Sequence, residues 1–306
     1  MTLRASILPE ARRGLLKSRL AAGHLPLRAL ECHDAMSAIL VANARSGAGL
    51  GFDALWASGF AHATTLGLPD AELTLLERKL GCVAEIASAT ALPIIVDADT
   101  GGDPLAFAQL CLRLEAIGVS AVIVEDKAGA KRTSLAEGVK HELEDPALFL
   151  AKIEAARQSM LSNDVILFAR IESLIAGAGL DDALARARAY LGGAPDGIVI
   201  HSKDKSGAEI LEFCAAYRSL EKELGVSKPL VLIPTAYPQF TGAALAEAGA
   251  SIVIHGNHMV RAAFAAMRTA AATILDHDRA LEADQTIAPV SDLFEAVGVD
   301  LPLVAR

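Results

Sequence analysis

Eight short apolar segments recur along the chain, and each ends in polar or small residues. They cover residues 27–31, 52–56, 93–97, 121–125, 165–170, 197–201, 230–234 and 252–255. Between them lie segments with the hydrophobic period of amphipathic helices, such as 181–190 and 208–224. Eight alternations of strand and helix predict a closed parallel (β/α)8 TIM barrel. An open doubly wound sheet is the alternative, but it normally has fewer strands and a glycine-rich turn after the first, and the chain has no Gly-x-Gly-x-x-Gly motif.

Helical patterns flank the predicted barrel at both ends. Residues 1–25 predict an N-terminal helix, and residues 261–278 predict a long alanine-rich helix after the last strand. Residues 291–296 predict another helix, with Ser291 as its N-cap. Because residues 257–306 exceed what one closing helix needs, we expect the extra C-terminal helices to pack on a neighbouring subunit of a homo-oligomer.

The chain has 306 residues, of which 53% are hydrophobic, and this is enough for one large domain. We expect a single domain over 1–306, with the barrel at about 26–275 and a C-terminal helical extension at about 276–306. No apolar run reaches the roughly 18–20 residues of a membrane span, and the N-terminal segment lacks the apolar centre of a signal peptide. The expectation is therefore a cytoplasmic protein with no membrane partner.

Charge and cysteine usage exclude two further classes of function. The net charge of −9, with no basic stripe, argues against a nucleic-acid partner. The four cysteines are scattered without Cys-x-x-Cys pairing, so they indicate neither disulfides nor a zinc site. A small-molecule substrate remains, and an anionic one is compatible with a divalent cation that supplies local positive charge.

Polar side chains gather at the C-terminal ends of the predicted strands, where parallel barrels carry their active sites. They are Glu31, His33, Ser58, Gly59, Asp97, Asp99, Glu125, Lys127, Arg170, Glu172, His201, Ser202, Thr235, Tyr237 and Asn257. Asp97, Asp99 and Glu125 would repel one another on adjacent segments unless a cation lay between them. Because all candidate ligands are oxygens, the sequence favours Mg²⁺, with Mn²⁺ as an alternative. A turn stabilised by side-chain hydrogen bonds is the alternative for residues 97–101.

Other strand ends offer groups that suit a small anion. Arg170 matches a planar or tetrahedral anion, Ser58 offers a hydroxyl, and Gly59 allows close approach of a substrate to the backbone. Together with a metal ion, these groups suit an α-keto acid. Trp56 lies on the second predicted strand, where it packs inside the barrel or contacts substrate. Asp70 either orders the site and accepts a proton, or is the N-cap of a helix over 71–80.

The segment 127–138 is predicted to be a lid over the site. Gly129 and Ala130 give it flexibility, and Gly138 is a candidate hinge. Its Lys131, Thr133 and Ser134 would close over a bound anion. The alternative is a solvated surface loop.

Seven motifs along almost the whole chain resemble the phosphoenolpyruvate mutase and isocitrate lyase superfamily. They are GFDALWASGF at 51–60, DADTG at 97–101, EDKAGAKRTS at 125–134, ARIESLIAG at 169–177, IVIHSK at 198–203, IPTAYPQ at 233–239 and IVIHGNHMVRAA at 252–263. Their order and spacing make the resemblance far more specific than any single motif. Two departures are Ala57 before Ser58-Gly59, where the mutases have Gly-Ser-Gly, and Gly102, where the family usually has an aromatic residue.

Within this resemblance, the residues of the predicted lid, 127–138, indicate which reaction is catalysed. Carbon–carbon lyases of the superfamily carry Cys-Gly-His there, and this loop has no cysteine. Thr133 stands where mutases have asparagine and where the phosphonopyruvate-hydrolysing members have threonine. The implied activity is Mg²⁺-dependent hydrolysis of the carbon–phosphorus bond of phosphonopyruvate to pyruvate and phosphate. The alternatives are a mutase that interconverts phosphoenolpyruvate and phosphonopyruvate, a lyase of a 2-oxo or 2-hydroxy acid, and a barrel without catalytic function.

The resemblance also implies residue roles and an assembly. The implied metal ligands are Asp97, Asp99 and Glu125. The implied substrate-binding residues are Trp56, Ser58, Gly59, Asp97, Lys131, Arg170 and His201. The implied catalytic residues are Thr133, Lys131, Ser134, Arg170, His201 and Asp70. The implied assembly is a dimer or tetramer in which subunits exchange a C-terminal helix.

Overall fold

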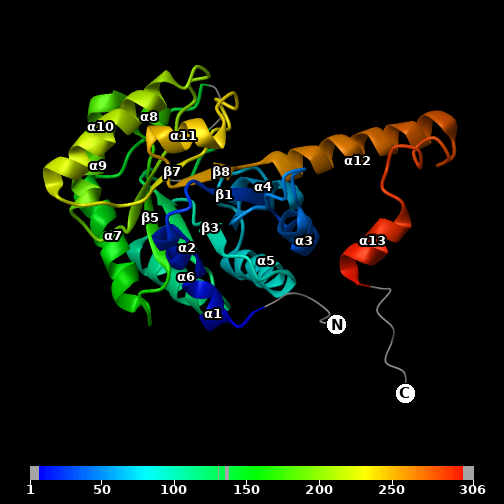
Figure 1. Ribbon diagram of the computed structural model, residues 1–306, viewed down its shortest axis with the longest axis horizontal. Helices are drawn as coiled ribbons and strands as arrows, with labels where there is room; N and C mark the ends of the chain where they lie inside the picture. The colour runs from blue at the N-terminus through cyan, green and yellow to red at the C-terminus, as the bar shows by residue number, and fades with distance from the viewer. Residues whose placement is uncertain (1–6, 130, 135–137, 299–306) are drawn as a thin grey trace.

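Eight parallel strands close into a barrel in the order of the chain, as predicted (Figure 1). The computed structural model describes residues 7–129, 131–134 and 138–298. The strands are β1 (Leu27–Cys32), β2 (Ala54–Ala57), β3 (Ile94–Asp97), β4 (Ala121–Glu125), β5 (Ile166–Ile171), β6 (Gly197–Ile200), β7 (Leu230–Leu232) and β8 (Ile252–His255). Each lies within or overlaps one predicted apolar segment, and the (β/α)8 barrel is confirmed.

Side chains alternate along each strand between the barrel interior and the surrounding helices, which gives an inner and an outer hydrophobic core. Successive side chains of a strand point to opposite faces, so every second residue faces the barrel interior. The inner cluster includes Ile95, Ile123, Phe168 and Val199, all fully buried. Leu16 belongs to the same cluster, and it reaches it from the N-terminal helix α2 (Leu15–Ala22).

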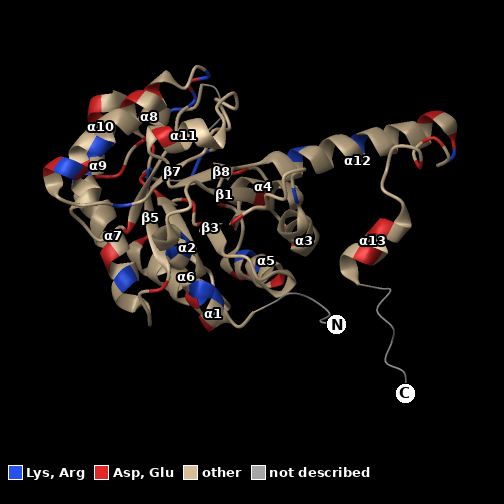
Figure 2. Cartoon of the chain, viewed as in Figure 1, with Lys and Arg blue, Asp and Glu red and all other residues tan. Residues whose placement is uncertain are grey.

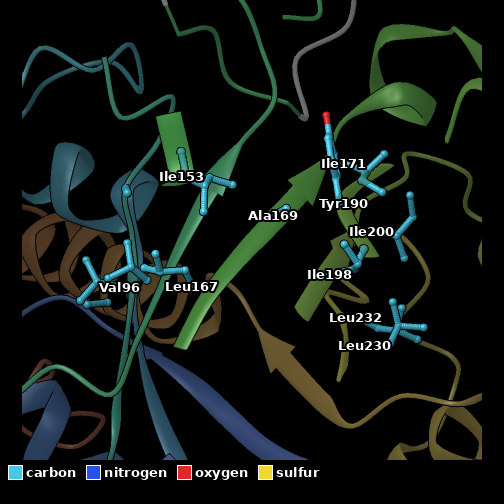
Figure 3. Packing of buried hydrophobic residues seen from close by; sticks show 14 of the residues in the cluster. Val96, Ile153, Leu167, Ala169, Ile171, Tyr190, Ile198, Ile200, Leu230 and Leu232 are labelled. Carbon is cyan, nitrogen blue, oxygen red and sulfur yellow. The ribbon is translucent and has the colours of Figure 1, made fainter. Parts of the chain in front are cut away.

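The outer core lies between the strands and the helices that surround them. Figure 3 shows outward-facing Val96, Leu167 and Ile198, with Tyr190 from a covering helix in the same cluster. The helices of this layer are α3 (Ala35–Asn43), α4 (Gly59–Thr65), α5 (Leu76–Ala89), α6 (Pro104–Ile117), α7 (Pro146–Ser159), α8 (Ser173–Ala176), α9 (Gly179–Leu191), α10 (Ala208–Leu224) and α11 (Gly242–Ala248). Some of these helices, such as α5 and α10, carry both acidic and basic residues (Figure 2).

The N-terminal segment differs from the single helix predicted over 1–25. The described part contains two helices, α1 (Pro9–Arg13) and α2, which meet at Gly14, and residues 1–6 lie outside the described residues. The break falls on Gly14, a poor helix former, and tertiary contacts hold the first helix in place. Arg12 is buried and donates to the carbonyl oxygens of Ala87 at 2.6 Å and Thr90 at 2.7 Å, which holds α1 against the barrel helices.

The C-terminal helices begin earlier than predicted. Helix α12 (His258–His277) starts directly after β8 and runs out from the barrel (Figure 1). Helix α13 (Val290–Val297) has Pro289 at its N-cap, so the predicted N-cap role of Ser291 is wrong. Residues 299–306 lie outside the described residues. Among the helices that are described, none has the length and apolar character needed to cross a membrane.

Candidate active site

Polar side chains at the C-terminal ends of the strands point inward and line one cavity. Asp97, Glu125, Arg170 and His201 each follow an inward-facing residue of their strand by two positions, so they project into the mouth of the barrel. The cavity there is lined by Trp56, Ser58, Phe60, Asp70, Asp97, Lys131, Thr133, Ser134, Arg170, His201, Ile233, Thr235, Gly256 and Asn257. Nine of the twelve residues to which the resemblance assigns roles are among them, as are Thr235 and Asn257 from the predicted strand ends, while Gly59, Asp99 and Glu125 lie outside this lining set.

Asp97, Asp99 and Gly59 meet at the end of β3. The Gly59 N–H donates to Asp97 Oδ2 at 3.2 Å, and the Asp99 N–H donates to Asp97 Oδ1 at 3.1 Å. Asp99 has a left-handed backbone with φ of 58°. A Cβ atom at position 59 would collide with Asp99 Oδ1 and lie 3.2 Å from Asp97 Oδ2. Glycine at position 59 therefore leaves room for both carboxylates close to the backbone.

Glu125 is a buried carboxylate whose hydrogen-bonding capacity is unmet. It is 1% exposed, and neither carboxylate oxygen has a hydrogen-bond partner within the described part of the chain. The nearest cationic atoms are Lys127 Nζ and Arg170 Nη2, each at 3.4 Å. Burial raises the pKa of Glu125 to about 7, although Arg170 opposes this rise. A buried carboxylate without donors is costly, so this position favours an additional cation.

Asp99 is held by two lysines. Lys79 Nζ lies 2.5 Å from Asp99 Oδ2, and Lys131 forms an ion pair with Oδ1. Burial opposes ionisation of Asp99, but the two lysines outweigh it and keep its pKa well below the ordinary value. Asp99 is therefore ionised at neutral pH.

The three carboxylates fit a divalent metal ion in their chemistry. Over residues 7–129, 131–134 and 138–298 there is no group of three or more His, Cys, Asp or Glu side chains arranged to hold a metal, so the ligand set of Asp97, Asp99 and Glu125 stays a prediction. All donors are oxygens, which suits Mg²⁺ or Mn²⁺. The unpartnered oxygens of Glu125 and the space left by Gly59 are compatible with such an ion.

The predicted lid contacts the strand ends. Lys131 and Ser134 are buried, so the alternative of a solvated surface loop is wrong for these residues. Lys131 pairs with Asp70 at 2.7 Å, and Ser134 Oγ donates to Glu172 Oε2 at 2.8 Å. Ala130, which was expected to give flexibility, lies outside the described residues.

Glu172 organises the cationic side of the cavity. It is fully buried and accepts a 2.5 Å hydrogen bond from Arg170 Nε, and it pairs with Lys127 Nζ at 3.0 Å. Arg170 Nη2 also contacts Ser134 Oγ and His201 Nδ1, both at 2.9 Å. Burial and the neighbouring Arg170 lower the pKa of His201, so its imidazole is neutral at pH 7. The guanidinium is thus held in a fixed orientation at the cavity.

Two features of the site differ from the sequence interpretation. Asp70 is not a helix N-cap, because α5 begins at Leu76, and Asp70 instead pairs with Lys131. Lys79, on α5, was not predicted as a site residue, although it contacts Asp99 and donates to the Asp97 carbonyl at 3.1 Å. Its position four residues before buried Val83 is a signal that could have shown that it faces the barrel.

Comparison with known proteins agrees with this architecture. The family described as phosphoenolpyruvate phosphomutase matches residues 16–275. The chain is 36% identical over 287 residues to phosphonopyruvate hydrolase from Variovorax sp. (strain Pal2), which covers 92% of this chain and 93% of that protein.

Solved structures give the same result. A phosphoenolpyruvate phosphomutase from Streptomyces platensis subsp. rosaceus is similar with a TM-score of 0.85 at 32% identity, covering 96% of each chain. A phosphonopyruvate hydrolase in complex with oxalate and Mg²⁺ has a TM-score of 0.81 at 34% identity, covering 98% of this chain and 96% of that one. The chain therefore belongs to the phosphoenolpyruvate phosphomutase family, within the phosphoenolpyruvate mutase/isocitrate lyase superfamily of enzymes.

Proposed function

We propose that the protein hydrolyses the carbon–phosphorus bond of phosphonopyruvate in an Mg²⁺-dependent reaction that yields pyruvate and phosphate. The observation that carries the proposal is that Thr133, on a loop whose sequence has no cysteine, lines the same cavity as Arg170 and His201. The similarity to the Variovorax phosphonopyruvate hydrolase supports the same substrate.

Asp97, Asp99 and Glu125 would hold the metal ion, with Mn²⁺ able to replace Mg²⁺. A similar phosphonopyruvate hydrolase structure contains Mg²⁺ with oxalate, which supports this choice. An ion held there would supply positive charge that stabilises the enolate left on the carbon side of the substrate, which would make it a better leaving group. Ser58, which lines the cavity and is the N-cap of α4, would orient the same end of the substrate together with the adjacent backbone of Gly59.

Arg170 and His201 would bind the phosphonyl group. Arg170 keeps its charge, because neighbouring Glu172 and Glu125 raise its pKa despite burial. Lys131 and Ser134 add a cation and a hydroxyl from the loop. Such groups stabilise the charge that spreads over the phosphoryl oxygens in a loose transition state.

The acceptor of the phosphoryl group in this proposal is a water molecule that Thr133 orients. The water oxygen forms the new bond to phosphorus, and the electron pair of the broken bond stays on carbon. The carbon then takes up one proton and becomes the methyl group of pyruvate. Asp70, which is tied to Lys131, is close enough to the loop to order it or to accept the proton released by water.

The second candidate is a mutase that interconverts phosphoenolpyruvate and phosphonopyruvate, and the structural similarity to the Streptomyces phosphomutase favours it. A mutase would need the same metal ion and the same binding of the phosphonyl group by Arg170 and His201. Only the acceptor of the phosphoryl group differs. A carbon–carbon lyase is disfavoured because the loop has no cysteine.

A phosphorus NMR time course of phosphonopyruvate with Mg²⁺ separates these functions. We expect the substrate signal to be replaced by inorganic phosphate. Phosphoenolpyruvate as the product would establish the mutase instead, and an unchanged spectrum would contradict both.

Replacement of Thr133 by alanine tests the proposed acceptor. We expect phosphate release to fall by at least about tenfold, because an unoriented water raises the barrier by about 1.4 kcal/mol or more. Thr133→Ser, which keeps the hydroxyl, is the matched control. Mn²⁺ binding should be the same in both variants, and unaltered turnover in Thr133→Ala would remove Thr133 from the mechanism.

A further inference from the structure

Arg186 is a cation on the buried face of α9, outside the cavity. It is 7% exposed, and its Nη1 atom donates to Asp126 Oδ2 at 3.1 Å and to the Glu144 carbonyl oxygen at 2.9 Å. Its Nε atom donates to Asp182 Oδ2 at 2.9 Å, one turn earlier on the same helix. Among the described residues, those that line the cavity do not include Arg186, so its effect on the site must be indirect.

The two acceptors of Arg186 Nη1 lie at the two ends of the segment 127–143, which includes the predicted lid. Asp126 directly follows β4 and precedes this segment, and Glu144 comes directly after it. The Glu144 N–H donates to the Asp126 carbonyl oxygen at 2.8 Å, so the two ends are also joined through the main chain. One guanidinium therefore holds the base of the segment together.

Asp126 also connects Arg186 to the cationic side of the cavity. Its Oδ1 atom accepts a 2.9 Å hydrogen bond from the Glu172 N–H, and its Oδ2 atom accepts one of 2.8 Å from the Tyr190 hydroxyl. The Glu172 carboxylate in turn accepts the 2.5 Å hydrogen bond from Arg170 Nε. A chain of buried contacts thus leads from α9 to the guanidinium of Arg170, which faces the cavity.

The contacts of Arg186 would be difficult to replace. Asp126 is fully buried, and a buried carboxylate that loses its cation is costly until the surrounding chain moves or water enters. The Glu144 carbonyl oxygen would lose its side-chain donor at the same time. Movement at the base would displace the catalytic side chains, and a small misplacement is enough to slow a reaction strongly.

We propose that Arg186 is a positioning residue that fixes both ends of the segment 127–143 and, through Asp126, the orientation of Glu172. Its link to the chemistry rests on the proposed function, because the reaction that it serves is the one proposed above. The positioning itself can be measured without substrate.

Trp56 provides that measurement. It is the only tryptophan of the chain and is 3% exposed. It lines the cavity together with Lys131 and Thr133 of the segment, so a displaced segment would uncover its indole ring. We expect Arg186→Met to raise the Stern–Volmer constant for acrylamide quenching of Trp56 by about twofold or more, because the segment opens locally while the barrel stays folded.

Turnover of phosphonopyruvate gives the second readout. We expect Arg186→Met to lower kcat for phosphate release by about tenfold or more and to change KM less, because misplaced groups lose contacts that form in the transition state. Arg186→Lys keeps the charge but not the planar fork, so both of its values should lie between those of the wild type and Arg186→Met. A purely structural role would lower the midpoint of urea denaturation and leave quenching and kcat unchanged.

Arg188→Met is the matched control. Arg188 lies on the same helix, but its guanidinium is half exposed and pairs with Glu223 of α10 at 2.8 and 2.6 Å. This variant should keep the wild-type quenching constant and kcat. If circular dichroism shows that Arg186→Met does not fold, Tyr190→Phe replaces it, since it removes another donor to Asp126 and should shift both values in the same direction.

The outcomes separate this inference from the proposed function. If the wild type releases no phosphate from phosphonopyruvate, the proposed function fails, and quenching alone decides whether Arg186 holds the segment. An unchanged quenching constant in the folded variant would overturn the role of Arg186, whatever the activity. A raised quenching constant with unchanged kcat would overturn its role in positioning groups for the reaction.

Discussion

His33 and Glu31 form a buried pair at the end of β1. His33 Nδ1 lies 2.6 Å from Glu31 Oε1, and the other carboxylate oxygen accepts a 2.8 Å hydrogen bond from the Val260 N–H at the start of α12. Burial opposes protonation of His33, but the hydrogen bond and charge of Glu31 outweigh it and raise the pKa of His33 above 6.5. The pair joins the first strand to the helix that follows the last one.

This pair should make stability depend on pH. A histidine whose pKa is raised in the folded state stabilises the fold fully below its unfolded value of about 6.5, and this contribution is lost as pH rises through the folded-state pKa. We expect the difference in free energy of unfolding between the wild type and His33→Gln to be largest in mildly acidic solution and to shrink at alkaline pH. Urea denaturation of both proteins across neutral pH measures it, and a difference that stays constant would show that His33 is neutral in the fold.

The sequence was sufficient to predict the positions of some site residues but not the contacts of others. The inward projection of Asp97, Glu125 and Arg170 follows from strand alternation, which the apolar segments already contain. The contact between Lys79 and Asp99 could not be predicted in this way, because it joins α5 to the turn that ends β3, the strand after this helix. The helix that was expected to start after Asp70 begins only at Leu76, which leaves Asp70 to pair with the loop.

The turn after β3 is the element on which the site depends most. Gly101 and Gly102 both have left-handed backbones, with φ of 75° and 68°. A Cβ at Gly101 would lie 2.7 Å from the Phe107 ring, which is fully buried on α6. A Cβ at Gly102 would lie 3.5 Å from the Ala106 Cβ, an ordinary contact. The two positions share a backbone conformation but differ in the space around them.

These neighbouring glycines form a matched pair for mutation. Gly102→Ala should lower the free energy of unfolding by about 1 kcal/mol, the cost of the left-handed backbone. Gly101→Ala should lower it by about 3 kcal/mol, because overpacking against Phe107 adds to the same backbone cost. Equal losses in urea denaturation would show that Phe107 moves aside without cost.

Strand segments were predictable as elements, and helix ends were not. Central strands buried on both faces form continuous apolar runs that few other elements resemble. The break between α1 and α2 lies at Gly14, a poor helix former, but the contacts of Arg12 with carbonyl oxygens of a distant helix and turn are not contained in the local sequence. The start of α13 follows from a local signal instead, because Pro289 is the N-cap and the helix begins at the next residue, one position before Ser291.

At the scale of the whole molecule, the C-terminal helices leave apolar surface uncovered. Phe264 and Met267 of α12 are 57% and 65% exposed, and they lie on the same helical stripe as buried Val260. Helix α13 also exposes large apolar residues, which are Val290, Leu293, Phe294 and Val297. Large apolar residues exposed along helices in this way are typical of interfaces between proteins.

We expect this surface to be covered by a second copy of the chain, so that the protein is a dimer or a tetramer in solution. A charge on the stripe would then have to be buried in the interface, at a cost that separates the subunits. The double variant Phe264→Glu and Met267→Glu should therefore have the mass of a monomer in sedimentation equilibrium. Leu161→Glu is the control, because Leu161 is 85% exposed on the loop after α7 and its replacement should leave the mass unchanged. A wild-type protein that sediments as a monomer would contradict the expected assembly, and the apolar stripe would then need another partner.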